Sequence, residues 1–174
     1  VAFAVDASAA GVFSMLFPVT AGRWATLQLP LSELPAKILF CRESEAEPFP
    51  IDAGQLIADQ FGLRTLVFAT PDRSVSRASQ AGRLGHALLQ LQPDGKILLQ
   101  DLGSKGGTYF APADESVLKS VFSAQFAEST VPMTVNPFES EVPWSTAGAG
   151  TQEIPRASLL RIGSFRVAVI ARTD

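Results

Sequence analysis

The sequence predicts an all-β fold, a β-sandwich of mainly antiparallel strands with short helical insertions. Two observations favour this class: 47% of the 174 residues are hydrophobic, and the apolar residues gather in short runs separated by Gly, Pro and Ser. Runs of this kind and spacing are typical of sandwich strands. We expect a single domain over residues 1–174, with an N-terminal extension over about residues 1–21 and an inserted helix and loop segment over about residues 111–157.

The first three strands are predicted over residues 12–17, 24–29 and 37–41, each of which is an apolar run. Cys41 ends the third run, and a lone cysteine beside Leu and Phe is typical of a small buried hydrophobe. A chain with one cysteine forms no internal disulfide bond, and this pattern favours a reducing, intracellular setting. No apolar run approaches the roughly 20 residues that a membrane-spanning helix needs.

A short helix is predicted over residues 52–62, followed by a strand over residues 65–69. Asp52 is a suitable N-cap, Gly62 suits the position after the last helical turn, and apolar residues between them share one helical face. The strand is rich in β-branched and aromatic side chains, which favour extended structure. This helix is the first expected interruption of the sandwich.

A β-hairpin is predicted in the middle of the chain. Residues 86–92 and 96–102 are its strands, and Pro93-Asp94-Gly95 is the turn that joins them. Residues 108–110 continue the sheet. Polar loops therefore lie on both sides of the hairpin.

A second helix is predicted over residues 115–127, with Asp114 as its N-cap. Its apolar stripe is expected to pack on the sandwich, and the alternative is a groove for a partner protein. The Pro and small residues that follow predict an irregular excursion. A closing hairpin is expected over residues 158–162 and 165–171, with a turn at Gly163-Ser164. The stripe consists of Val117, Leu118, Val121, Phe122 and Phe126.

Two polar loops flank the central hairpin and carry most of the functional signal. Residues 74–79 have the sequence Ser-Val-Ser-Arg-Ala-Ser, and residues 101–109 have the sequence Asp-Leu-Gly-Ser-Lys-Gly-Gly-Thr-Tyr. Their order and chemistry resemble the forkhead-associated (FHA) domain, a phosphothreonine-peptide reader, whose pattern is Ser-Arg-x-His followed by Asp-x-x-Ser-x-Asn-Gly-Thr. The closing Gly-marked hairpin also resembles the end of that fold. The resemblance covers about residues 22–110 and 156–171.

The resemblance implies a phosphopeptide site in these loops. Ser76 matches the phosphate-contacting serine, Arg77 matches its basic neighbour, and Asp101 begins the turn that carries Ser104. The family also has an upstream Gly-Arg, for which Arg64 is an imperfect match because Leu63 interrupts the pair. Arginine suits phosphate through its planar fork of donors. The phosphopeptide-binding residues expected on these grounds are Ser76, Arg77, Arg64, Arg73, Ser104, Lys105, Gly106, Gly107 and Thr108.

Two positions depart from the family pattern. Ser79 stands where the spacing places the family's His, which is chiefly structural, and Gly106 stands where the family has the Asn that holds the peptide backbone. A lost hydrogen bond to a bound peptide costs about 1–3 kcal/mol, which lowers affinity by about 5- to 150-fold. We therefore expect the fold to persist with weakened or lost phosphate recognition.

The sequence predicts no enzyme. His86 is the only histidine and begins an apolar strand, where a structural role is expected, and no catalytic or metal constellation can be placed around it. The Gly-rich residues 103–108 lie between strands, whereas a nucleotide-binding P-loop opens a helix. No cofactor, catalytic residue or metal site is predicted. The formal net charge of -3 gives no reason to expect nucleic acid or an anionic membrane as a partner.

The predicted function is a noncatalytic interaction module with a protein partner, the phosphothreonine peptide being the ligand that the resemblance implies. The alternative is a structural or scaffolding domain of a multiprotein assembly that binds independently of phosphorylation. Family membership would suit an intracellular location, including nuclear or chromosome-associated assemblies. Because the sequence does not begin with Met, we also expect it to be a piece of a longer protein.

Overall fold

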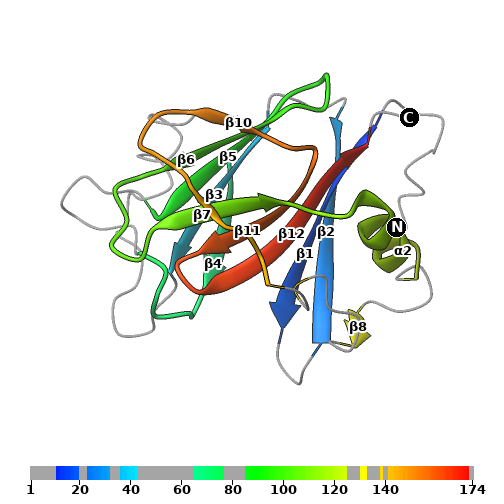
Figure 1. Ribbon diagram of the computed structural model, residues 1–174, viewed down its shortest axis with the longest axis horizontal. Coiled ribbons are helices and arrows are strands. Elements are labelled where there is room, and N and C mark those ends of the chain that lie inside the picture. The colour runs from blue at the N-terminus through cyan, green and yellow to red at the C-terminus, as the bar shows by residue number, and fades with distance from the viewer. Residues whose placement is uncertain are drawn as a thin grey trace.

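The computed structural model describes residues 11–19, 23–31, 36–42, 65–76, 85–124, 130–132, 138 and 141–172. Within these ranges the chain forms a seven-stranded sheet and a five-stranded sheet (Figure 1). Side chains from both sheets pack into one hydrophobic core between them. The predicted β-sandwich is therefore confirmed.

The larger sheet contains both ends of the described chain. Its strand order is β8-β2-β1-β12-β11-β7-β9, and every pairing is antiparallel. The closing hairpin predicted from the sequence is the β11–β12 pair, and Gly163 takes the positive φ of its turn. The bounds are β8 (Thr130–Pro132), β2 (Arg23–Pro30), β1 (Val12–Val19), β12 (Phe165–Arg172), β11 (Ala157–Ile162), β7 (Thr108–Pro112) and β9 (Ser145–Thr146).

The smaller sheet has the strand order β10-β6-β5-β3-β4. The predicted central hairpin is the antiparallel β5–β6 pair, whereas β3 and β4 run parallel. A parallel pair requires a long connection, and here that connection is residues 43–64, outside the described residues, where the helix 52–62 was predicted. The bounds are β10 (Gln152–Ile154), β6 (Ile97–Asp101), β5 (Ala87–Leu91), β3 (Ala36–Arg42) and β4 (Thr65–Thr70).

Alternation along β12 divides its apolar residues between two clusters. In β12, Val167 and Val169 face the core between the sheets, whereas Ala168 and Ile170 belong to a second cluster on the outer face of the larger sheet. Cys41 is fully buried in β3, as expected. Strand β12 is apolar on both faces because the core between the sheets covers one face and the second cluster covers the other.

The helix α2 (Glu115–Ala124) helps to cover the outer face of the larger sheet (Figure 1). The carboxylate of Asp114 accepts hydrogen bonds from the amides of Ser116 and Val117, so the predicted N-cap is confirmed. Leu118 is fully buried in the outer cluster, while Val117 is 41% exposed. The stripe therefore packs on the sandwich through Leu118. The other stripe side chains, those of Val121, Phe122 and Phe126, lie outside the described residues.

Segments predicted as additions to the sandwich contribute strands to both sheets. Strand β1, within residues 1–21, lies between β2 and β12 in the larger sheet. Strands β8, β9 and β10, within residues 111–157, pair with β2, β7 and β6. These three strands are short and, where described, mostly polar or exposed, so they give no hydrophobic run in the sequence. Pairing with an existing sheet edge satisfies their main-chain hydrogen-bonding groups, and Ile154 of β10 also reaches the core between the sheets.

Within the described ranges, no helix combines the length and apolar content needed to cross a membrane.

Candidate functional site

Three loops meet at one end of the sandwich. They are the described parts of the β4–β5 connection, the β6–β7 loop and the β11–β12 turn. Hydrogen bonds join each of them to the next, although they are far apart in the sequence. The two polar loops singled out from the sequence are thus brought into contact.

The imidazole of His86 holds two of these loops together. Its side chain is fully buried, its Nδ1 accepts a hydrogen bond of 2.9 Å from the amide of Ser76, and its Nε2 lies 2.7 Å from the carbonyl oxygen of Gly107. Because Nδ1 accepts, the proton belongs on Nε2, which donates to Gly107. The backbone of His86 also bonds to Phe40 and Leu102. The expected structural role of His86 is confirmed.

The bridge between the loops is made by His86, whereas the resemblance matched Ser79 to the family's His. The resemblance assigned that His the task of holding the loops together, and His86 performs it here. His86 lies ten positions after Ser76, whereas the Ser-Arg-x-His pattern places the two only three apart. Fixed spacing selected Ser79, whereas the hydrogen bonds by which His86 bridges the loops depend on the folded chain. Ser79 itself lies outside the described residues.

The carboxylate of Asp101 organises the β6–β7 loop. It accepts hydrogen bonds from the amides of Gly103 and Ser104 and from the hydroxyls of Ser104 and Thr108, the last at 2.7 Å. The Ser104 hydroxyl in turn accepts a bond of 3.1 Å from the amide of Gly107. Thr108 is fully buried. The side chains of Ser104 and Thr108 therefore shape the loop and point into it.

The β4–β5 connection is anchored to the β11–β12 turn through Ser74. Asp72 accepts bonds from the amide and the hydroxyl of Ser74, at 2.9 and 2.6 Å. The same hydroxyl accepts a bond of 2.7 Å from the amide of Ser164. The amide of Gly163 donates to the carbonyl of Gly107 at 2.9 Å, which completes the contact among the three loops.

The two glycines of the β6–β7 loop lie where a side chain would collide. A Cβ on Gly106 would lie 2.9 Å from the carbonyl oxygen of Ser74 and 3.2 Å from the Cα of Gly163. Gly107 has a φ of +78°, and a Cβ there would lie 2.6 Å from the hydroxyl of Tyr109. The loops therefore pack backbone against backbone at Gly106, the position that corresponds to the family's Asn.

Cationic side chains surround the loops. Arg73 and Lys105 are exposed, and Ser76 is half-buried. Arg73 and Ser76 lie on the β4–β5 connection, and Lys105 lies on the β6–β7 loop. Arg42, at the end of β3, was not selected from the sequence: its amide donates to the carbonyl of Ser76 at 3.0 Å, and its Nη1 donates to the carbonyl of Arg73 at 2.9 Å. The only sequence signal for Arg42 is its position directly after an apolar strand. Arg64 and Arg77 lie outside the described residues.

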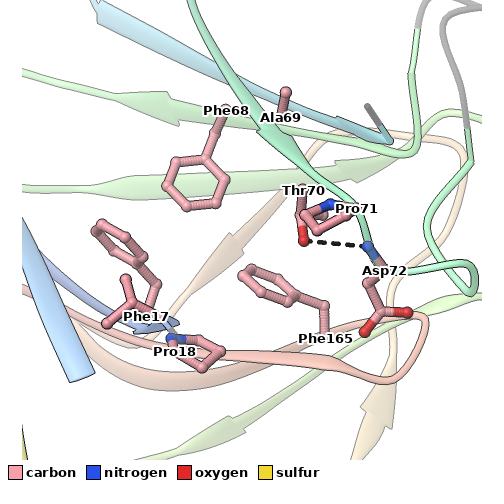
Figure 2. Close-up of a pocket in the computed structure, with 9 residues that line it drawn as sticks. Phe17, Pro18, Phe68, Ala69, Thr70, Pro71, Asp72 and Phe165 are labelled. Carbon is pink, nitrogen blue, oxygen red and sulfur yellow. Dashed lines mark hydrogen bonds between the residues drawn. The ribbon is translucent and has the colours of Figure 1, made fainter. Parts of the chain in front are cut away.

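An apolar pocket of about 690 Å³ lies next to the same loops (Figure 2). Phe17 and Phe68 meet edge to face with ring centroids 4.8 Å apart, and Phe165 lies 5.9 Å from Phe68. Asp72 reaches both the pocket and Ser74, and its amide donates to Thr70 Oγ1 at 3.3 Å, the dashed line in Figure 2. The pocket is lined by Phe17, Pro18, Val19, Phe68, Ala69, Thr70, Pro71, Asp72 and Phe165.

In the part of the chain that the structure describes, His, Cys, Asp and Glu side chains do not gather into a group of three that could hold a metal ion. The acids beside the loops, Asp72 and Asp101, are bound to neighbouring amides and hydroxyls. The arrangement therefore presents loop backbone, the Ser76 region and cations to a ligand.

Comparison with known proteins finds similarity among solved structures. No family model matches the sequence, and no curated protein matches it. The chain is similar to the FHA domain of the CT664 protein from Chlamydia trachomatis, with 14% identity, a TM-score of 0.41, and coverage of 91% of this chain and 96% of that one. It is also similar to a structure from an analysis of phosphothreonine-dependent FHA domain interactions, with 15% identity, a TM-score of 0.40, and coverage of 91% and 95%. Both structures concern FHA domains, which the two loop motifs resemble.

Proposed function

We propose that this chain is a noncatalytic protein-interaction module of the FHA type, and that the loops around His86 form its ligand surface. The observation that carries the proposal is the imidazole bridge from the Ser76 amide to the Gly107 carbonyl. This bridge sets the positions of both loop motifs before any ligand arrives. Loops that are ordered in advance lower the entropy cost of binding.

The ligand we propose is a phosphothreonine in an extended peptide. A phosphate group carries a charge near -2 and accepts charge-assisted hydrogen bonds, which are stronger than neutral ones. Arg73 and Lys105 are exposed cations on the two loops, and Ser76 lies between the Arg42 backbone and His86. Arg64 and Arg77 stay predicted contributors, on the strength of the sequence resemblance alone. The partner is therefore a protein rather than a small molecule.

Phosphate recognition is expected to be weak. Gly106 has no side-chain amide to bind the peptide backbone, and the hydroxyls of Ser104 and Thr108 are engaged with Asp101. Losing one peptide hydrogen bond costs about 1–3 kcal/mol. The groups left to contact the phosphate directly are then the Ser76 hydroxyl, loop amides and the nearby cations.

A phosphorylation-independent scaffolding role is the second candidate. The observation that favours it is the close packing of the β6–β7 loop on Ser74, where a Cβ at position 106 does not fit. Such closure suits a loop that stabilises the sandwich rather than one that receives a peptide. In that case a partner in an intracellular assembly would bind to another surface of this domain.

The deciding experiment measures capture of a degenerate phosphothreonine peptide library and of its unphosphorylated counterpart, at low and at physiological salt. Retention that requires phosphate, falls with salt and is lost in Ser76→Ala supports the phosphopeptide reader. The matched control is Ser145→Ala, which removes an exposed serine on β9 and should bind normally. Equal capture of both libraries, or none, rejects the reader in favour of the scaffold.

A further inference from the structure

Two arginines lie directly opposite each other on the outer face of the larger sheet. Arg161 of β11 and Arg166 of β12 are cross-strand partners. Their neighbours Leu160, Ile162 and Val167 belong to the core between the sheets. Because side chains alternate along a strand, both arginines point outward.

Aromatic rings hold these arginines in place. The Arg161 guanidinium lies 4.0 Å from the centroid of the Tyr109 ring and 5.6 Å from that of Trp144. The Arg166 guanidinium lies 5.8 Å from the ring of Phe138, which itself stacks on Trp144 with centroids 6.4 Å apart. Cation–π contacts of this kind orient a guanidinium while leaving its charge unneutralised.

Among the residues that the structure describes, the pair has no negative partner. Neither arginine forms an ion pair with the described acids, and the Nε of Arg161 is buried without a hydrogen-bond partner. Like charges opposite each other in a sheet repel, and an unpartnered buried donor is costly. The repulsion between the two charges is relieved when anionic groups bind the exposed ends of the two guanidiniums.

We propose that Tyr109, Trp144, Arg161 and Arg166 form a docking surface for an acidic protein segment with Asp or Glu side chains on alternate residues. Side chains on alternate residues of an extended chain lie about 7 Å apart on one face, a spacing suited to two arginines on adjacent strands. Arginine and aromatic residues are also the types enriched at energetically important interface positions.

Nucleic acid fits this surface less well. A duplex or single strand needs a broad basic surface or an extended groove, whereas the chain carries a net charge of -3 and the surface has two cations. The aromatic rings are also partly covered by the guanidiniums. The surface adjoins the loops around His86 through Tyr109, whose hydroxyl lies beside Gly107. An acidic segment would contact the two arginines and not the Ser76 region, so the proposal stands whether or not those loops bind phosphothreonine.

The test uses a dye-labelled, unphosphorylated peptide of alternating Glu and Ser, with a Gln-Ser peptide as its neutral counterpart. Fluorescence anisotropy should show binding of the acidic peptide only, weakened about tenfold or more in the double variant Arg161→Gln/Arg166→Gln, because two charge-assisted contacts are lost. The double variant Arg161→Lys/Arg166→Lys keeps the charge and should retain part of the affinity. In the unsubstituted protein, peptide addition should shift the NMR signal of the Trp144 indole N–H.

The control variant Lys96→Gln/Arg172→Gln removes the same net charge at other positions and should bind almost normally. Three results overturn the proposal: full affinity in Arg161→Gln/Arg166→Gln, an equal loss in the control variant, or an unshifted Trp144 signal at saturating peptide. Tighter binding of an oligonucleotide of equal charge also overturns it, in favour of a nucleic-acid surface. Thermal unfolding of each variant separates lost binding from lost folding.

Discussion

The amide of Ser164 donates a 2.7 Å hydrogen bond to the hydroxyl of Ser74, ninety positions earlier in the chain. This bond joins the β11–β12 turn to the β4–β5 connection. Gly163, the residue before Ser164, has a φ of +64°. A Cβ on Gly163 would lie 2.7 Å from the Ser74 hydroxyl and even closer to the Ser74 carbonyl oxygen. The contact therefore depends on a glycine at position 163.

Gly163→Ala should destabilise the protein by about 2–4 kcal/mol, because a left-handed backbone conformation and a steric overlap both disfavour alanine. Urea denaturation measures this loss. Gly148→Ala is the control, since a Cβ there meets nothing within 4 Å, and its effect should stay within about 0.5 kcal/mol. Equal stability of the two variants would show that the turn can move away from Ser74.

His86→Ala should cost about 2–5 kcal/mol, because it leaves the Ser76 amide and the Gly107 carbonyl without their partner and opens a cavity. His86→Gln should lose less, since its amide offers both an acceptor and a donor. The measurements are chemical denaturation and hydrogen exchange at the Ser76 amide. Unchanged protection of that amide in His86→Ala would contradict the bridge.

Gly106→Asn introduces the residue that the FHA pattern has at the matched position, and it should lower stability by about 1–3 kcal/mol, because a Cβ there overlaps the Ser74 carbonyl. We expect no gain in phosphothreonine-peptide affinity. Thermal unfolding and peptide titration measure the two quantities. A variant of normal stability with improved phosphopeptide binding would show that the loop opens readily.

Asp114→Ala should lower the melting temperature by removing the N-cap of α2. Hydrogen bonds from the Ser116 hydroxyl and from the amides of Ser116 and Val117 lower the pKa of Asp114 below its ordinary value of 3.8. A carboxyl group with a lowered folded-state pKa adds stability above its unfolded pKa and loses it as the pH falls through the folded value. The difference between the original protein and Asp114→Ala should therefore be full near pH 7 and shrink below about pH 4.

Melting curves from pH 3 to pH 7 measure this dependence. Asp114→Asn is the matched control, because Asn caps helices nearly as well as Asp but does not ionise. Its stability difference from Asp114→Ala should not change through this pH range. If the stability difference between the original protein and Asp114→Ala stays constant down to pH 3, the cap does not depend on the ionised form of Asp114.

Much of the fold could be predicted because its signals are local. Apolar runs identified nine strands, and Pro93-Asp94-Gly95 and Gly163-Ser164 marked the turns of two hairpins. Asp114 similarly marked the start of α2. The short strands β8, β9 and β10 were missed, since their stability comes from pairing with an existing edge rather than from their own apolar residues.

The candidate site divides in the same way. The sequence by itself determined the Asp101 turn, because its donors lie within seven positions of the carboxylate. Only the tertiary structure decided that His86 bridges the loops and that Arg42 joins Ser76. Turns and strands follow from interactions between near neighbours in the chain. Bridges between loops depend on how segments far apart in the sequence pack together, which no local pattern specifies.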